Sequence, residues 1–78
     1  MPDTIVAARD GLDVAALGER IRRERTRQRR PLDDLAAGAG VSRSMLSAVE
    51  RGTKVPTVLV LHRIATGLGT NITHLLVG

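Results

Sequence analysis

Residues 32–52 read LDDLAAGAGVSRSMLSAVERG, and this stretch decides the fold. Two short segments with apolar residues at helical spacing lie on either side of Gly40, a residue that adopts left-handed backbone geometry at low cost. Ala36 is small enough to let a second helix cross the first closely. The stretch therefore predicts a helix-turn-helix. The residues assigned to its structural frame are Leu35, Ala36, Gly40, Val41, Leu46 and Val49.

The second helix of this pair is expected over about residues 43–51, because Ser42 is a strong N-cap. When Leu46 and Val49 face inward, five other positions form one stripe on the opposite face of the helix. That stripe consists of Arg43, Ser44, Ser47, Ala48 and Arg51. A short helix with a polar, positively charged stripe of modest size can enter the major groove of DNA.

Outside this stretch, apolar periodicity predicts three further helices, over about 13–28, 58–67 and 72–76. Their expected N-caps are Asp13, Thr57 and Asn71. Pro31 separates the first helix from the second. The sequence thus predicts an all-α fold, a compact five-helix bundle over residues 13–78 that contains the helix-turn-helix. Residues 1–12 show no clear period and are interpreted as a flexible N-terminal arm.

The positive charge is concentrated in one short segment. Residues 20–30 contain seven arginines and one acid, a net charge of +6, whereas the whole chain carries +4. Two interpretations are open: a solvated helix face balanced by nearby acids, or a surface that holds phosphates, because arginine can grip two phosphate oxygens at once. Phe, Tyr and Trp are absent. Their absence disfavours binding of single strands through base stacking and favours duplex DNA.

Composition excludes several classes of function. Seventy-eight residues form one small domain, too short for a catalytic domain of ordinary size. The absence of cysteine excludes a disulfide scaffold and a thiolate zinc site, and it favours a cytoplasmic protein. His62 and His74 are interpreted as surface residues, since no third metal ligand lies near them in the sequence. No catalytic nucleophile with its base is visible, so we expect no enzyme, no metal and no cofactor.

The chain carries a family resemblance over residues 17–76. The matching pieces, in order, are LGERIR at 17–22, LA at 35–36, GVSRSMLSAVERG at 40–52, PT at 56–57 and RIATGLG at 63–69. Together they resemble the XRE or phage-repressor-like family of helix-turn-helix DNA-binding domains. The resemblance is closest to bacterial regulators of the XRE–cupin type, in which an effector domain follows this one. It implies a sequence-specific regulator of transcription, of repressor type, that binds double-stranded DNA with the 43–51 helix in the major groove.

The resemblance also implies a role for individual positions. The residues that correspond to base-reading positions are Ser42, Arg43, Ser44, Ser47 and Ala48. The residues expected at DNA phosphates are Arg51, Lys54, Arg29, Arg30 and Leu32, the last through its backbone N–H only. Arg25 and Glu50 match a pair that bridges the first helix to the recognition helix, and we expect that salt bridge here.

The sequence departs from the family pattern at three places. Glu24 stands where leucine is frequent, and Ala48 stands where a long polar residue often reads a base. Arg29-Arg30 replaces a Gly-Leu turn after the first helix. A side chain at positive φ costs about 1 kcal/mol, so this turn is expected to be strained.

The apolar run Val58–Leu61 covers more than one face of its helix and is too short to span a membrane. Two interpretations are open: a helix buried on two sides, or a homodimer surface formed together with the last helix. A dimer favours a palindromic operator, because it presents two recognition helices about one DNA turn apart. An alternative function on the same fold is an antitoxin or another protein-interaction module.

Overall fold

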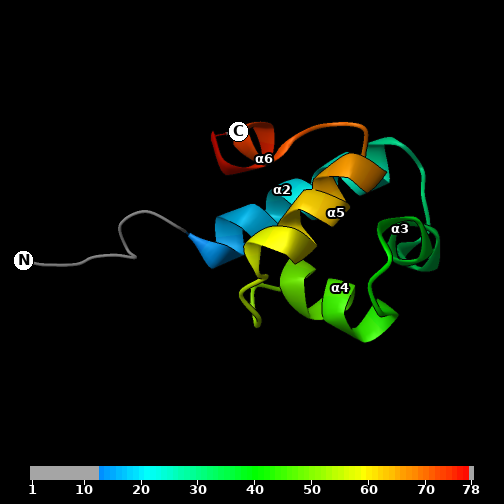
Figure 1. Cartoon of the computed structure of the whole chain (residues 1–78), viewed down its shortest axis with the longest axis horizontal. Coiled ribbons are helices and arrows are strands. Elements are labelled where there is room, and N and C mark those ends of the chain that lie inside the picture. The colour runs from blue at the N-terminus through cyan, green and yellow to red at the C-terminus, as the bar shows by residue number, and fades with distance from the viewer. Residues whose placement is uncertain (1–12, 78) are drawn as a thin grey trace, which may run out of the picture.

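The computed structural model describes residues 13–77, and this part of the chain consists of five α-helices without a strand (Figure 1). They are α2 (Val14–Arg27), α3 (Leu32–Ala39), α4 (Arg43–Glu50), α5 (Val58–Gly67) and α6 (Ile72–Val77). The predicted all-α helix-turn-helix architecture is confirmed. The proposed N-terminal arm at 1–12 lies outside the described residues. No helix within 13–77 has the length and apolar character needed to cross a membrane.

The helices begin at the residues that capping chemistry selects. Side-chain oxygens of Asp13, Ser42, Thr57 and Asn71 each accept a hydrogen bond from a backbone N–H three residues further on, at 2.8 to 3.1 Å. These are the four N-caps that the sequence predicts. Pro31 precedes α3 without a side-chain cap, and Gly40 ends α3 at φ 70°.

An aliphatic core joins all five helices. α3 packs against α4 and α5, while α2 packs against α4 and α6, and α5 also contacts α6. Because the chain has no aromatic residue, aliphatic side chains fill the centre of the molecule. Full burial of each one contributes roughly 1.5–3 kcal/mol to the free energy of folding. The largest fully buried side chains are Leu17, Ile21, Leu35, Leu46, Val49, Ile64 and Leu75.

The turn between α2 and α3 adopts the strained geometry that the sequence predicts. Arg29 has φ 57°, the only positive φ of a non-glycine residue within 13–77. The N–H groups of Arg29 and Arg30 donate to the carbonyls of Thr26 and Arg25, which closes the end of α2. Arg25 also donates from Nη1 to the carbonyl of Arg30, at 2.8 Å. This side-chain contact offsets part of the cost of a left-handed arginine.

Gly18 allows α2 and α4 to approach each other backbone to backbone. A Cβ atom at this position would lie 2.3 Å from the carbonyl oxygen of Val49 and 2.6 Å from that of Glu50. Neither oxygen can move aside without shifting the end of α4. Gly38 is also helical, but its Cβ would meet only the Nη2 atom of Arg30, at 3.3 Å.

These two glycines predict opposite effects of the same substitution. Gly18→Ala should lower the free energy of unfolding by about 2 kcal/mol or more, because overpacking against backbone outweighs the gain in helix propensity. Gly38→Ala, the matched control, should raise it by about 0.5–1 kcal/mol, since the end of the Arg30 side chain has to shift by only a few tenths of an ångström. Urea unfolding followed by circular dichroism measures both. Equal stability of the two variants would contradict a backbone contact at Gly18.

Candidate nucleic-acid interface

The face of α4 that points away from the core carries the predicted base-reading residues. Arg43 and Ser44 are exposed at its first turn, while Ser47 and Ala48 are half-buried further along. Ser42 is exposed as well, although its Oγ caps the helix by accepting from the N–H of Met45 at 3.0 Å. Figure 1 shows α4 at the edge of the bundle beside α3, with α6 on the opposite side. The structure therefore gathers these five positions along one short helix at the molecular surface.

Positions predicted to contact phosphate lie at both ends of the helix-turn-helix. Arg51 and Lys54 are exposed directly after α4, and Arg29 is exposed before α3. Leu32 packs its side chain against the core, so only its backbone can reach a ligand. Because Pro31 offers α3 no side-chain cap, the first N–H groups of that helix remain available within the described chain.

Arg30 differs from the other predicted phosphate contacts because its side chain is half-buried and serves the fold. Its Nη1 atom donates to the carbonyl of Gly67, at the end of α5. Only part of the guanidinium is therefore left for a phosphate.

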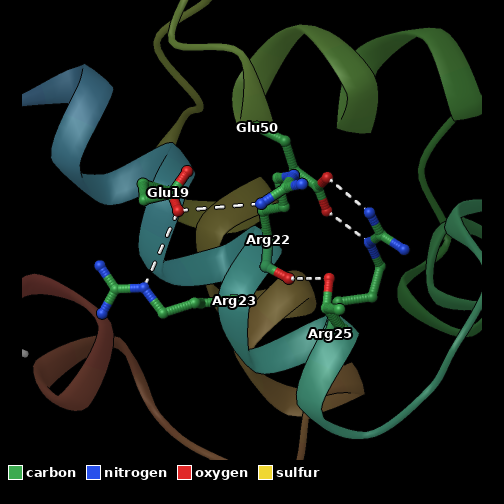
Figure 2. A network of polar contacts seen from close by, with 6 residues as sticks. Glu19, Arg22, Arg23, Arg25 and Glu50 are labelled. Carbon is green, nitrogen blue, oxygen red and sulfur yellow. Dashed lines mark hydrogen bonds and ion pairs between the residues drawn. The ribbon is translucent and has the colours of Figure 1, made fainter.

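Arg25 and Glu50 form the ion pair that the sequence predicts (Figure 2). The Nε and Nη2 atoms of Arg25 donate to the two carboxylate oxygens of Glu50, at 2.8 and 3.0 Å. Both side chains are largely buried, at 16% and 6% exposed. The hydrogen bonds to Glu50 raise the pKa of Arg25 above its usual value. This two-pronged contact fixes the last residue of α4 to the last turn of α2.

Most of the arginines between 20 and 30 are engaged within the molecule. Arg20 donates from Nη1 to the carbonyls of Leu75 and Leu76, at 3.0 and 2.8 Å, and thereby holds the C-terminal end of α6. Arg22 and Arg23 both lie 3.8 Å from the carboxylate of Glu19 (Figure 2). Six of the seven arginines thus make contacts within the molecule, and the interpretation of the run as a surface that holds phosphates stays a prediction.

Glu24 explains one departure from the family pattern. It accepts hydrogen bonds from Nε of Arg27 at 3.1 Å and from Nε2 of Gln28 at 2.9 Å. Both contacts stabilise the carboxylate and lower the pKa of Glu24 to about 2. Gln28 also donates to the carbonyl of Leu68 at 2.8 Å, which links α2 to the end of α5. A polar connection therefore occupies a position where leucine is frequent in the family.

The sequence interpretation missed one contact at the interface. Nε of Arg43 lies 2.5 Å from Oδ1 of Asp33, and both side chains are exposed. Asp33 lies in the first turn of α3, where a carboxylate also interacts favourably with the positive N-terminal end of the helix. The sequence pattern alone does not indicate this pair, because the two residues come together only where α3 crosses α4.

The fold and the exposed polar face of α4 define a helix-turn-helix domain. The family model described as Helix-turn-helix, HTH_3, matches residues 21–75. The chain belongs to this family.

Solved structures show the same relationship. The restriction-modification controller protein C.AhdI from Aeromonas hydrophila has a TM-score of 0.79 and 30% identity, covering 81% of this chain and 96% of that one. The clp gene regulator ClgR from C. glutamicum has a TM-score of 0.75 and 32% identity, covering 81% of this chain and 82% of that one. The DNA-binding domain of the P22 C2 repressor has a TM-score of 0.78 and 28% identity, covering 86% of this chain and 88% of that one. A search of curated proteins finds no match. The chain is therefore similar to regulators of transcription rather than to enzymes.

The Arg25–Glu50 pair predicts strong coupling between its partners. Arg25→Met should lower the free energy of unfolding by about 3 kcal/mol, because it leaves the buried Glu50 carboxylate without its counter-charge. Adding Glu50→Gln should recover a substantial part of that loss, since no buried charge then remains. Chemical denaturation of the two single variants and the double variant measures the coupling. Arg23→Met, at an exposed arginine of the same helix, is the control and should change stability by less than about 0.5 kcal/mol. Strictly additive losses would contradict a direct interaction.

Proposed function

We propose that the protein is a sequence-specific regulator of transcription that binds double-stranded DNA and acts as a repressor. In this proposal α4 enters the major groove as the recognition helix. The observation that carries the proposal is the exposed polar face of α4 in a helix-turn-helix frame, with Arg43 at its first turn. The named relatives, a controller protein, a gene regulator and a repressor domain, support it. A cytoplasmic location follows from this role.

The side chains of the interface divide into two kinds of contact. Arg43 is the proposed direct reader, because an arginine that binds guanine O6 and N7 makes the commonest specific contact in the major groove. Ser42, Ser44, Ser47 and Ala48 offer only short hydroxyl or methyl contacts beside it. Arg51, Lys54 and Arg29, together with the backbone N–H of Leu32, are the proposed phosphate contacts. Arg30 contributes only with the part of its guanidinium that Gly67 does not occupy.

The division of roles predicts distinct binding defects. Affinity for duplex DNA should fall steeply with salt, because bound arginines and lysines displace condensed counterions. Lys54→Ala should weaken all sequences alike and reduce the slope of log K against log salt by about 1, whereas Arg43→Ala should flatten the base preference. Fluorescence anisotropy on selected and random duplexes at several salt concentrations measures both effects.

A charge-matched control separates the interface from the general charge of the protein. Arg23→Ala removes one positive charge on α2, at a residue beside Glu19. Its effect on the base preference should be negligible. A salt-independent isotherm for the wild-type chain, or loss of base preference in all three variants, would contradict the proposed roles.

The proposal includes a homodimer that binds a palindromic operator. The N-terminal part of α5 exposes Val58 at 77% and Leu59 at 57%, and α6 exposes Val77 at 77%. Apolar side chains this exposed find favourable burial in a subunit contact. The interpretation of α5 as a helix buried on two sides is wrong, because two residues of its apolar run are open to solvent. From the narrower resemblance to XRE–cupin regulators, we further propose that this DNA-binding domain acts together with an effector domain of the cupin type.

The dimer proposal predicts that a substitution in the subunit contact can abolish the dimer and still leave binding to a single half-site largely intact. Leu59→Glu should shift the protein to a monomer and weaken binding to a palindromic duplex by tenfold or more, because it places a charge in the subunit contact. Binding to a single half-site should change far less. Thr66→Glu, at an exposed position of the same helix, adds the same charge and should leave both unchanged. Sedimentation velocity and anisotropy give the readouts, and a wild-type monomer at all concentrations would refute the dimer.

A further inference from the structure

Arg43 and Asp33 form an ion pair where α3 and α4 meet. Asp33 lies in the first turn of α3, and Arg43 is the first residue of α4. Nε of Arg43 lies 2.5 Å from Oδ1 of Asp33. The side chains are 69% and 74% exposed, so the pair is open to a ligand from solvent. Exposed pairs of this kind add little to folding stability in water, and the pair strengthens when a bound ligand excludes solvent from it.

The shortest contact of the pair is at Nε of Arg43. A guanidinium carries five N–H groups in a fixed planar arrangement, and none of those on the two terminal nitrogens of Arg43 donates a hydrogen bond to Asp33 within residues 13–77. Those terminal nitrogens can donate together to O6 and N7 of a guanine. A carboxylate at Nε also restricts rotation of the long side chain, which lowers the entropy lost when the base contact forms.

The negative charge of Asp33 has a second consequence at a DNA surface. An unrestrained arginine is drawn to phosphate oxygens of any sequence, because that attraction is electrostatic and independent of the bases. A carboxylate beside Arg43 cancels part of this attraction and repels a phosphate that approaches the same place. It therefore lowers affinity for every sequence and leaves the directional contact with a base as the favourable one.

We propose that Asp33 is a positioning residue that determines specificity: it holds Arg43 for guanine and opposes its use as a general phosphate contact. This inference rests on the proposed DNA-binding function and deepens it. Asp34 provides an internal comparison. It lies in the same first turn of α3 and carries the same charge, yet within residues 13–77 its carboxylate makes no ion pair.

The test uses the whole chain and DNA selected from a random duplex library by the wild-type protein. Within the selected site, each guanine is replaced in turn by 7-deazaguanine, which lacks the N7 acceptor. The guanine read by Arg43 is the one whose replacement weakens binding of the wild type but not of Arg43→Ala. The loss of affinity at that guanine is then measured for the wild type, Asp33→Asn and Asp34→Asn, with thermal melting as the check on folding.

We expect a loss of about tenfold at that guanine for the wild type and for Asp34→Asn, in the range of one good base contact. For Asp33→Asn the loss should fall to about threefold or less. Both asparagine variants should bind random duplex DNA more tightly than the wild type, since each removes one negative charge near the phosphates. The Arg43→Ala/Asp33→Asn double variant should discriminate no worse than Arg43→Ala alone, because Asp33 acts through Arg43.

Each remaining outcome contradicts a definite claim. An undiminished guanine penalty in Asp33→Asn would overturn the role of Asp33 and leave the DNA-binding function standing. If the guanine penalty falls equally in Asp33→Asn and Asp34→Asn, the effect comes from the general charge of the surface, which also overturns the inference. If the wild-type protein enriches no sequence from the library, the proposed function fails and the role of Asp33 fails with it.

Discussion

The side chain of Arg25 holds together the three segments on which the helix-turn-helix depends. From the last turn of α2 it reaches the last residue of α4 through two hydrogen bonds to Glu50 and reaches the turn before α3 through the carbonyl of Arg30. α3 and α4 are eight residues each, too short to be stable alone. Their relative position therefore depends on contacts with α2. Because the Glu50 side chain is 6% exposed, loss of Arg25 would leave a buried charge at the end of α4.

Close backbone contacts take the place of large side chains in this core. At Gly18 the carbonyls of Val49 and Glu50 lie where a Cβ would be, and at Gly67 a Cβ would meet Leu35 Cδ1 at 3.1 Å. A chain without aromatic residues has little side-chain volume with which to fill gaps between helices. It reaches a dense interior by bringing the helix axes closer. The same closeness makes the position of α4 sensitive to a single added methyl group.

Local chemistry in the sequence predicted most of the fold, because N-caps and apolar spacing act within a few residues. Asp13, Ser42, Thr57 and Asn71 begin helices as expected, and the family resemblance supplied the pairing of Arg25 with Glu50. Contacts between distant segments were not predictable in this way. The density of arginines between 20 and 30 is visible in the sequence, but the carbonyls of Gly67, Leu75 and Leu76 that engage them are brought there only by tertiary packing. Gly18 gave no signal either, because a glycine inside a helix indicates only a propensity cost.

The internal use of these arginines changes how the charge of the molecule bears on DNA. Arg20, Arg25 and Arg30 are engaged by the fold, so fewer guanidinium groups are free to grip phosphate oxygens, although the net charge of +4 is unchanged. Around Arg43, the outward face of α4 offers only serine and alanine at the proposed base-reading positions. On the proposed function, discrimination between sequences is concentrated at one long, flexible side chain, whose freedom is costly for precise recognition. A restraint on that side chain matters more here than on a face with several readers, and Asp33 is the neighbouring group that can supply it.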